Sequence, residues 1–349
     1  MKKQVLACVM AVSMVVLSAC GGSGSGGTAT AAAGGSGGAS AEQSSGDSYK
    51  IRVAHVTGTG SPYDYGANKF KELVEAGSGG RVTVEVFAGD MTTDDVEGVE
   101  MTQNGNLEVM WASTGALSGY VSDLGVIQLP FLFDSPETVE KALTGEFGQT
   151  ILKEVDQVDG ILGLAFHEDG WRNILTKGVT INSVGDMKGV RMRSMTNEVC
   201  VAMYEALGAT PISLSSGEIF TSIQNGVVDG QDNSVLYAKA DGYIEAIDNI
   251  CDIHHFYTSG LIVANQKWFE ALSAEDQELI RKSAEEAGAA QRAWFLQADE
   301  ELIAEYEAKG YTVTRPDDLD AWREAVQPVY DKMYKQYPEW EKLVNMIQQ

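Results

Sequence analysis

Histidine, cysteine and basic side chains are scarce in this sequence, and each shortage excludes a class of function. The 349 residues include four histidines and four cysteines, and none of the cysteine spacings is that of a metal site. Lys and Arg together number 25 against 50 Asp and Glu, which gives a formal net charge of -25. Binding to nucleic acid or to anionic lipid requires clustered cations. We therefore expect no nucleic-acid partner and no basic patch that docks on a membrane.

Signatures of common catalytic and phosphate-binding sites are also missing. The sequence has no Gly-x-Ser-x-Gly nucleophile elbow and no Walker loop, and Gly58-Thr59-Gly60 lacks the third glycine of a dinucleotide-binding turn. His254 and His255 are adjacent on an expected strand, so their side chains point to opposite faces and cannot both bind one metal ion. We expect no catalytic residue, no cofactor and no metal.

The amino terminus is typical of an exported lipoprotein. Two lysines precede an apolar run from Val5 to Leu17, which is too short for a stable transmembrane helix. The next residues end in Ser18-Ala19-Cys20 and look like the lipobox of bacterial lipoproteins, in which Cys20 is acylated and becomes the first mature residue. An ordinary signal peptide is the alternative. We expect residues 1–20 to be a lipoprotein signal peptide and the protein to be extracytoplasmic, anchored to the membrane by lipid on Cys20.

The segment after the expected cleavage site differs in composition from the rest of the chain. Residues 21–48 are almost wholly Gly, Ser, Ala and Thr, so they can bury little and are expected to form a flexible tether. Beyond the tether only Cys200 and Cys251 remain as cysteines. In an oxidising compartment they could form a disulfide, and two buried thiols in separate elements are the alternative.

Hydrophobic periodicity predicts an α/β protein, and the length favours two domains. Residues 50–56 and 81–87 alternate apolar and polar side chains, and a helical pattern over 63–76 separates them. This β-α-β order favours parallel pairing of the two strands. Thr93 is expected to cap a helix over 94–103.

The second half of the chain repeats this design after an expected turn at Asp169-Gly170. A strand over 190–193 is followed by a helix over 196–207, and Ser215 and Glu218 form a capping box. Helical composition then extends from 274 to 309 without a break. At 1.5 Å per residue such a helix is about 50 Å long, which is more than one small domain needs. We therefore expect it to cross both domains.

Two arginines at strand spacing single out one candidate site. Arg191 and Arg193 share one face of the expected strand, and Arg193 is its last residue. Ligands of open α/β sheets bind beyond the carboxyl ends of the strands, and a helix that begins near Thr196 directs its amino-terminal N–H groups into the same space. Pairing with surface carboxylates is the alternative, and we prefer it for Arg191. For Arg193 we favour binding of a ligand carboxylate.

Five stretches in order carry a resemblance to a known family. They are His55–Phe70, Leu129–Phe133, Glu168–Arg172, Asp186–Arg193 and Gly226–Asn233. From Ile51 to about Tyr334 the chain resembles the DctP-like solute-binding proteins of tripartite ATP-independent periplasmic (TRAP) transporters. The resemblance implies a two-lobed, periplasmic-binding-protein-like α/β clamp with hinge strands and one long helix spanning both lobes. Lobe I would take 49–169 with about 259–298, and lobe II 170–258 with about 299–349.

The same resemblance implies the residues of the site. Arg193 matches the family's carboxylate-binding arginine, Arg172 matches a second arginine that approaches the acid, and Asn233 assists Arg193. Four further residues fall at positions that line the pocket, namely Trp171, Glu168, Ser113 and Ser216. For Trp171 a place in the core at the hinge is the alternative.

The function implied is that of a receptor, expected to be a monomer, which binds a small-molecule carboxylate and delivers it to the TRAP membrane permease subunits. The polar candidates in the site suit hydroxyl groups, so we favour a sugar acid or hydroxy acid over a plain dicarboxylate. The alternatives are an ABC-type or sensory solute-binding protein and an extracytoplasmic enzyme that acts on acids.

Overall fold

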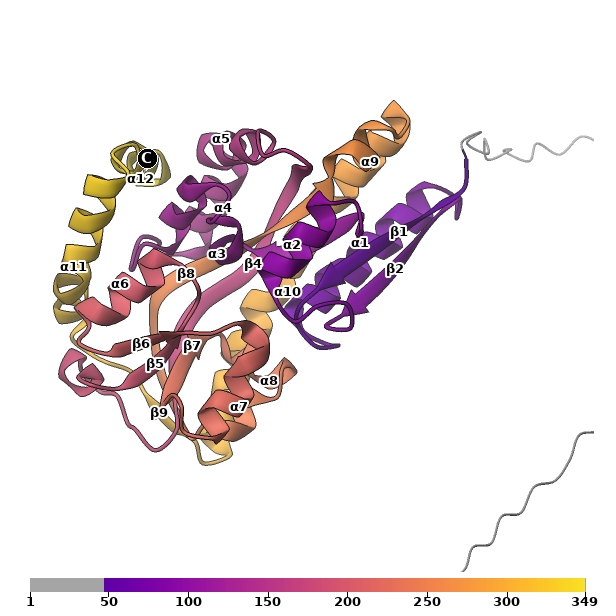
Figure 1. The fold of residues 1–349 in the computed structure, drawn as a ribbon. Coiled ribbons are helices and arrows are strands. Elements are labelled where there is room, and N and C mark those ends of the chain that lie inside the picture. The colour runs from indigo at the N-terminus through magenta and orange to yellow at the C-terminus, as the bar shows by residue number, and fades with distance from the viewer. Residues whose placement is uncertain (1–46, 349) are drawn as a thin grey trace, which may run out of the picture. The chain divides into compact units, whose positions relative to one another are not determined.

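Two long antiparallel strands run through the middle of one sheet. In the computed structural model, which describes residues 47–348, β4 (Ile161–Thr176) pairs with β8 (Asn249–Asn265) along nearly its whole length. Figure 1 shows the two strands running between two groups of shorter strands. The predicted signal peptide, Cys20 and all but the last two residues of the predicted tether lie outside the described residues.

The shorter strands form two sets, each made of parallel strands, one on each side of the pair β4 and β8. The first set joins the sheet through β3 on β8, and the second joins through β7 on β4. The strand order is β2-β1-β3-β8-β4-β7-β5-β6, and β9 adds in parallel to β8. The bounds of the six shorter strands in this order, followed by β9, are Val82–Ala88, Tyr49–His55, Val109–Ser113, Gly230–Asn233, Arg191–Ser194, Thr210–Ser213 and Thr312–Thr314.

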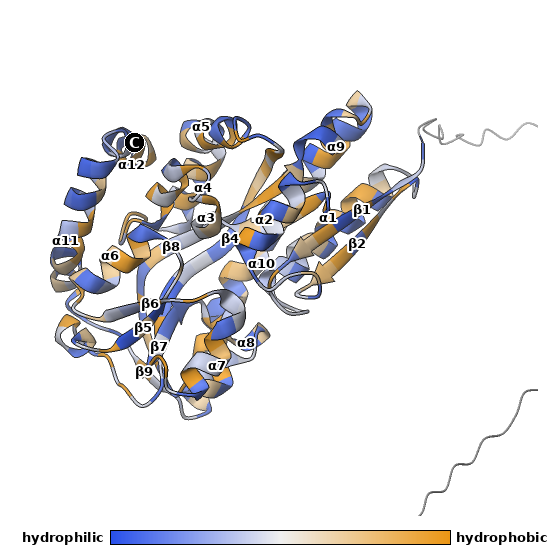
Figure 2. Cartoon of the chain, in the orientation of Figure 1, coloured by the Kyte–Doolittle hydropathy of each residue, from blue (hydrophilic) through white to orange (hydrophobic). Residues whose placement is uncertain are grey.

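Helices connect the strands and cover the sheet, as the β-α-β pattern predicted. The helices α1 to α12 have the bounds Pro62–Gly77, Asp95–Gln103, Thr114–Leu117, Pro136–Thr144, Glu146–Val155, Glu198–Ala206, Ile219–Gln224, Val235–Ala240, Gln266–Glu270, Ala274–Ala308, Leu319–Gln336 and Trp340–Gln348. Four short 3-10 helices, η1 to η4, occupy Ser122–Gln128, Val184–Met187, Ser216–Glu218 and Tyr243–Ala246. Figure 2 shows hydrophilic and hydrophobic residues side by side along single helices such as α2 and α11, which is typical of amphipathic helices.

Helix starts agree with the predicted caps at some positions and differ at others. Ser215 and Glu218 form the predicted capping box. Ser273 caps α10 by accepting the N–H of Asp276. The prediction for Thr93 is wrong, because Asp94 caps α2 through hydrogen bonds from the next residues. The helix expected from Thr196 begins at Glu198, where the side chain of Asn197 accepts an N–H and provides the cap.

The turn expected at Asp169-Gly170 is wrong. Both residues lie inside β4, whose pairing with β8 shifts register between Glu168 and Gly170. Gly170 has a φ of 89°, and a Cβ there would lie 2.3 Å from the ring of Phe295. A glycine with positive φ can serve a β-bulge as well as a turn. Gly170 therefore marks an irregular backbone, but the irregularity is a bulge within β4 and not a turn that ends the strand. The strand β4 therefore runs through this bulge and continues to Thr176.

The long helix α10 contributes to two separate hydrophobic cores, as expected of a helix that spans both lobes. Ile280, Ala284 and Ala287 pack in the core between the sheet and α1. Leu302 and Tyr306 pack in the core around α7 and α8. A third core on the other side of the sheet contains residues from both sets of strands together with α11 and α12.

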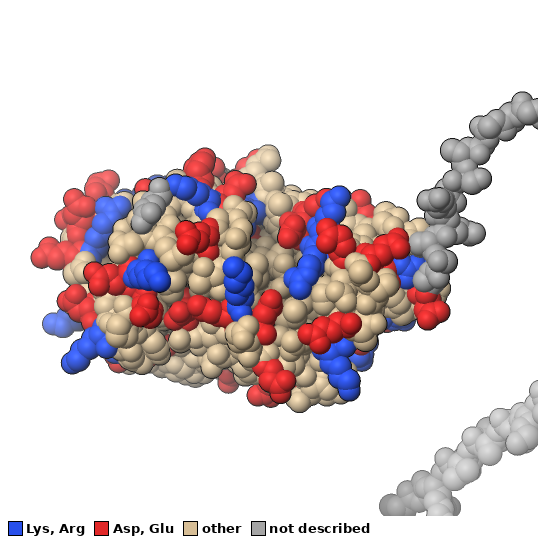
Figure 3. Space-filling model, turned by 90° about the horizontal axis from the view of Figure 1, so that it is seen from above, with Lys and Arg blue, Asp and Glu red and all other residues tan. Residues whose placement is uncertain are grey.

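The surface carries the acidic excess without a basic patch on the face shown in Figure 3, where single Lys and Arg side chains lie among more numerous Asp and Glu. None of the helices within residues 47–348 is long and apolar enough to cross a membrane.

Cys200 and Cys251 are both buried free thiols, so they do not form the disulfide that was one of the two alternatives for this pair. Burial raises the pKa of each thiol to about 12.

Substitution of Gly288 tests how closely α10 packs on the sheet. A Cβ at this position would lie 2.4 Å from the carbonyl oxygen of Phe166 in β4. Alanine normally stabilises a helix over glycine by about 1 kcal/mol. Here we expect Gly288→Ala to lower the free energy of unfolding by about 1–3 kcal/mol in urea denaturation, because the backbones must separate.

The exposed neighbour Ala289 is the matched control. Ala289→Gly should cost about 1 kcal/mol through helix propensity alone. If Gly288→Ala instead stabilised the protein, close packing of α10 on β4 would not limit this position.

Candidate functional site

One pocket lies where the carboxyl ends of the shorter strands and the middle of β4 meet. Its lining comes from segments far apart in the sequence: Val56, Thr57, Tyr63, Asp94, Asp95, Val96, Ser113, Gly115, Ala116, Asp169, Arg172, Arg193, Met195, Thr196, Leu214, Ser215, Ser216, Ile219, Asn233, Tyr237, Asp241 and Tyr243. We call this cavity the central pocket. Its position agrees with the rule that places ligands of open α/β sheets beyond the carboxyl ends of the strands.

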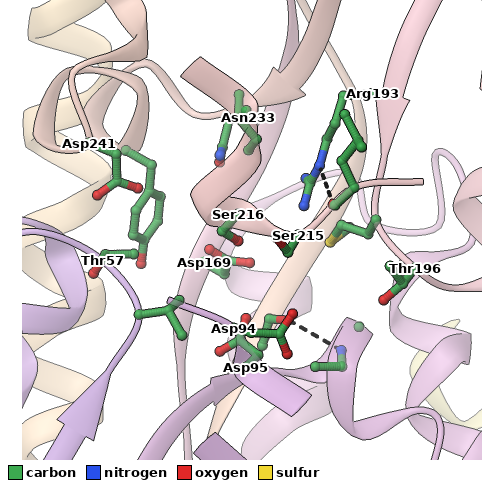
Figure 4. Close-up of a pocket in the computed structure, with 18 of the residues that line it drawn as sticks. Thr57, Asp94, Asp95, Asp169, Arg193, Thr196, Ser215, Ser216, Asn233 and Asp241 are labelled. Carbon is green, nitrogen blue, oxygen red and sulfur yellow. Dashed lines mark hydrogen bonds between the residues drawn. The ribbon is translucent and has the colours of Figure 1, made fainter. Parts of the chain in front are cut away.

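Arg193 extends from β5 into the central pocket (Figure 4). Its side chain is buried, with 5% of the residue exposed, and its Nε donates to the carbonyl oxygen of Leu214 at 3.0 Å. None of the ion pairs among the described residues includes Arg193. Burial and the nearby charge of Arg172 lower the pKa of Arg193. A buried guanidinium without an anionic partner is suited to bind a ligand carboxylate.

Arg191, on the same strand, has the opposite environment. Its side chain is 43% exposed, its Nε donates to the carboxylate of Asp229 at 3.0 Å, and its Nη1 donates to the carbonyl oxygen of Gly226 at 2.7 Å. The prediction that Arg191 pairs with a surface carboxylate is therefore confirmed.

Arg172 lies in β4 and lines the same pocket, but its charge is already compensated. It forms a buried ion pair with Asp232 of β7, and its Nη2 donates to the carbonyl oxygen of the same residue at 2.6 Å. A carboxylate oxygen of Asp169 lies 3.7 Å from its Nη1. Although burial opposes its charge, these two carboxylates raise the pKa of Arg172 above its ordinary range. The side chain is consequently held in place before any ligand arrives.

Asn233 follows Asp232 and also faces the pocket. Its Nδ2 donates to the hydroxyl of Tyr243, and its Oδ1 accepts the N–H of Ser234 at 3.0 Å. Ser113 and Ser216 line the pocket as well, from the end of β3 and from η3. Five of the seven predicted ligand-binding residues thus come together, namely Arg193, Arg172, Asn233, Ser113 and Ser216.

Glu168 and Trp171 do not line the central pocket. Glu168 is buried outside the lining, where Tyr257 donates a hydrogen bond to its Oε2 at 3.0 Å and the Nε of Arg292 lies 3.3 Å from the same oxygen. Burial raises the pKa of Glu168 to about 7. The ring of Trp171 packs on Tyr257 with 5.1 Å between centroids and faces a second cavity that includes Phe131 and His254. Both side chains contact Tyr257 of β8, and neither belongs to the lining of the central pocket.

Four aspartates of the pocket were missed by the sequence reasoning. We call Asp94, Asp95, Asp169 and Asp241 the aspartate wall. In Figure 4, Asp94, Asp95 and Asp241 lie across the pocket from Arg193. A signal was available for two of them, because adjacent acids begin the helix α2 on the edge where ligands of such sheets bind. Fifty acidic residues in the chain concealed that signal.

The aspartate wall holds carboxylates that repel one another. Burial and the neighbouring charge of Asp169 raise the pKa of Asp95 to about 7, and the same two causes raise the pKa of Asp241 to about 6. Burial also raises the pKa of Asp169 itself, against the attraction of Arg172. Among the residues that the structure describes, no group of His, Cys, Asp and Glu has the arrangement of a metal site.

The two pocket arginines should differ in their effect on stability. Arg172→Met leaves Asp232 as an unpaired buried charge, so we expect it to lower the free energy of unfolding by about 3–5 kcal/mol. Arg193→Met removes an uncompensated cation, so without ligand it should change that free energy by less than about 1 kcal/mol or increase it. Urea denaturation of the ligand-free variants measures both. An equal loss of the free energy of unfolding in both variants would contradict the view that Arg172 is paired with Asp232 while Arg193 has no anionic partner.

The raised pKa of Asp95 predicts a pH-dependent stability. The native state keeps this proton up to about pH 7, whereas the unfolded chain loses it near the ordinary value of 3.8. The contribution of Asp95 to the free energy of unfolding therefore falls as pH rises from about 4 to about 7. Asp95→Asn has no proton to lose, so its advantage in melting temperature over the wild type should grow across this window and then stay constant.

Thermal melts of the ligand-free protein at several pH values measure this difference. The exposed Asp90 is the matched control, and Asp90→Asn should show no such growth. A constant difference between Asp95→Asn and the wild type at all pH values would exclude the raised pKa.

Comparisons with known proteins agree with this geometry. The family described as bacterial extracellular solute-binding protein, family 7 (DctP), matches residues 53–337. A solute-binding protein of Verminephrobacter eiseniae is 29% identical over 287 residues, which cover 82% of this chain and 85% of that protein. The C4-dicarboxylate-binding protein DctB of Bacillus subtilis is 26% identical over 288 residues, covering 81% of this chain and 82% of DctB.

A solved structure gives the same result at the level of the fold. The sugar acid binding protein DctPAm from Advenella mimigardefordensis, in complex with galactonate, superposes with a TM-score of 0.83 and 26% identity, covering 86% of this chain and 98% of that one. The family match covers most of the chain, and relatives of the same family are TRAP solute-binding proteins. The chain therefore belongs to family 7 of the bacterial extracellular solute-binding proteins, the DctP-like receptors of TRAP transporters.

Proposed function

We propose that the chain binds a small organic acid in the central pocket and delivers it to the membrane subunits of a TRAP transporter. The observation that carries this proposal is the buried Arg193, which reaches into the pocket without a carboxylate partner. The family is one of extracytoplasmic substrate-binding receptors. Solved relatives bind galactonate, glucuronate and succinate, all of which carry a carboxylate.

In this proposal Arg193 holds the ligand carboxylate with two parallel N–H donors. Arg172, fixed by Asp232, orients the same carboxylate, and Asn233 supports the arrangement from the next strand. Ser113 and Ser216 offer hydroxyl groups to the remainder of the ligand, which favours a sugar acid or a hydroxy acid. Glu168 and Trp171 act through the strands behind the pocket, since neither side chain lines it.

Binding is coupled to closure of two lobes. We assign lobe I to 49–169 with about 259–298 and lobe II to 170–258 with about 299–349, so that the chain crosses between lobes in β4, β8 and α10. The register of β4 on β8 shifts at three places, which supports bending there. The closed form is then the one that the permease recognises.

The proposal includes the place where the receptor works. Lipid on Cys20 would hold the monomeric receptor at the outer face of the membrane, and residues 21–48 would give it reach. A tether of this composition would leave the body free to meet the permease.

Arg193→Lys tests the carboxylate clamp. An ammonium cannot supply two parallel donors to one carboxylate, so we expect the affinity for the bound acid to fall by about a hundredfold or more. A thermal-shift screen of organic acids first finds the acid that stabilises the wild type, and isothermal titration calorimetry then measures the dissociation constant of each variant.

Arg191→Lys is the matched control, because Arg191 lies on the same strand and pairs with Asp229 away from the pocket. It should bind the acid as the wild type does. Unchanged affinity of Arg193→Lys would mean that Arg193 is not the carboxylate-binding residue.

A further inference from the structure

The charges that line the central pocket do not match a ligand that is only an anion. Four aspartates face the pocket against two arginines. Arg172 is neutralised by Asp232, which lies behind the lining. Arg193 is then the remaining cation among the lining residues, and a ligand carboxylate would use its charge. An acid without a positive group would leave the aspartate wall uncompensated.

The partners of the aspartate wall leave much of its hydrogen-bonding capacity open. Asp94 accepts two N–H groups of α2, and Asp241 accepts the N–H of Gly58 at 2.8 Å. The carboxylate of Asp95 interacts with Ser113, and its buried oxygen Oδ1 has no hydrogen-bond partner among the described residues. None of the ion pairs within the described residues includes Asp94, Asp95 or Asp241. In their ionised form these carboxylates are acceptors only, and what they lack is a donor with positive charge.

The opposite side of the pocket supplies an independent observation. The side chain of Arg193 is more than nine-tenths buried, points into the pocket, and donates to the described part of the chain only through its Nε. The cavity therefore has a cationic end without an anionic partner in Arg193, and an acidic end where Asp94, Asp95 and Asp241 have no cationic partner among the described residues. A ligand with both charges would compensate both ends at once.

We propose that the ligand is a zwitterion, an amino acid or amino sugar acid whose carboxylate binds Arg193 and whose ammonium group binds the aspartate wall at Asp95. This inference rests on the proposed function and narrows its substrate class. It departs from the sugar acid or hydroxy acid that the serines of the pocket favour, because the serines can also receive the hydroxyls of an amino sugar acid.

The physical reason is the difference between an ammonium and a hydroxyl group among carboxylates. An ammonium offers three donors and a full positive charge, so it can satisfy Asp95 and reduce its repulsion from Asp169. A hydroxyl offers one donor and no charge. Hydrogen bonds between charged groups are roughly twice as strong as those between neutral groups. In a closed pocket with little water, this difference should decide which of two otherwise equal ligands binds.

Matched pairs of acids that differ by one ammonium for one hydroxyl test the proposal. The panel is alanine and lactate, aspartate and malate, glutamate and 2-hydroxyglutarate, and glucosaminate and gluconate, each screened by thermal shift on the purified full chain at pH 7.5. For each pair that stabilises the protein, calorimetry should give the amino member a dissociation constant lower by about tenfold or more.

Asp95→Asn provides the variant arm. This variant should lose most of the preference for the amino member of a pair. Its affinity for the amino acid should fall by about tenfold or more, whereas its affinity for the hydroxy acid should stay within a few-fold of the wild-type value or increase. Asp90→Asn, an exposed carboxylate outside the pocket, should leave the preference unchanged.

The possible outcomes distinguish a failure of the zwitterion proposal from a failure of the proposed acid receptor. Tighter binding of the hydroxy member in every stabilising pair would overturn the zwitterion and leave the acid receptor intact. An equal loss for both members in Asp95→Asn would also overturn it, since Asp95 would then not read the ammonium. Stabilisation by no acid of either kind would count against the proposed function as well.

Discussion

The ion pair between Arg172 and Asp232 is the interaction on which the central pocket depends. It joins β4 to β7 in the interior, and Tyr204 donates a further hydrogen bond to the same carboxylate. Because Asp232 is committed to Arg172, it is not available to neutralise Arg193. The pocket keeps one uncompensated guanidinium for this reason, even though the chain has twice as many acidic as basic residues. A buried charge with no partner is costly in a ligand-free protein and is retained where a ligand supplies the partner.

Much of the fold could be predicted because its signals are local. The cap at Ser273 and the glycine at 310 bound the long helix, and the β-α-β alternation predicts parallel strands without any tertiary information. The glycine at 170 was harder, because a positive φ serves a bulge as well as a turn. Only the pairing of β4 with β8 distinguishes the two, and that pairing joins residues about ninety positions apart.

Some residues of the candidate site could likewise be predicted from the sequence, and others could not. Arg193 could be selected because it ends a short strand, and the family resemblance led to Arg172 and Asn233. The sequence could not reveal that Arg172 is occupied by a carboxylate sixty positions away, since this depends on the register of β4 and β7. The aspartate wall was hidden for another reason. Its members come from separate segments, and nothing local distinguishes Asp95 or Asp241 from a solvated acid on a helix or loop.

The three register shifts between β4 and β8 have a consequence for how this protein can change its ligand. They divide a continuous ladder into short, regular lengths separated by irregular joints. In the function proposed above, bending resides in the backbone at these joints, whereas the side chains proposed to contact the ligand, such as Arg193 and Asp95, lie elsewhere. Substitutions in the pocket can therefore alter selectivity without redesigning the motion, and one mechanical frame can serve receptors for chemically different nutrients.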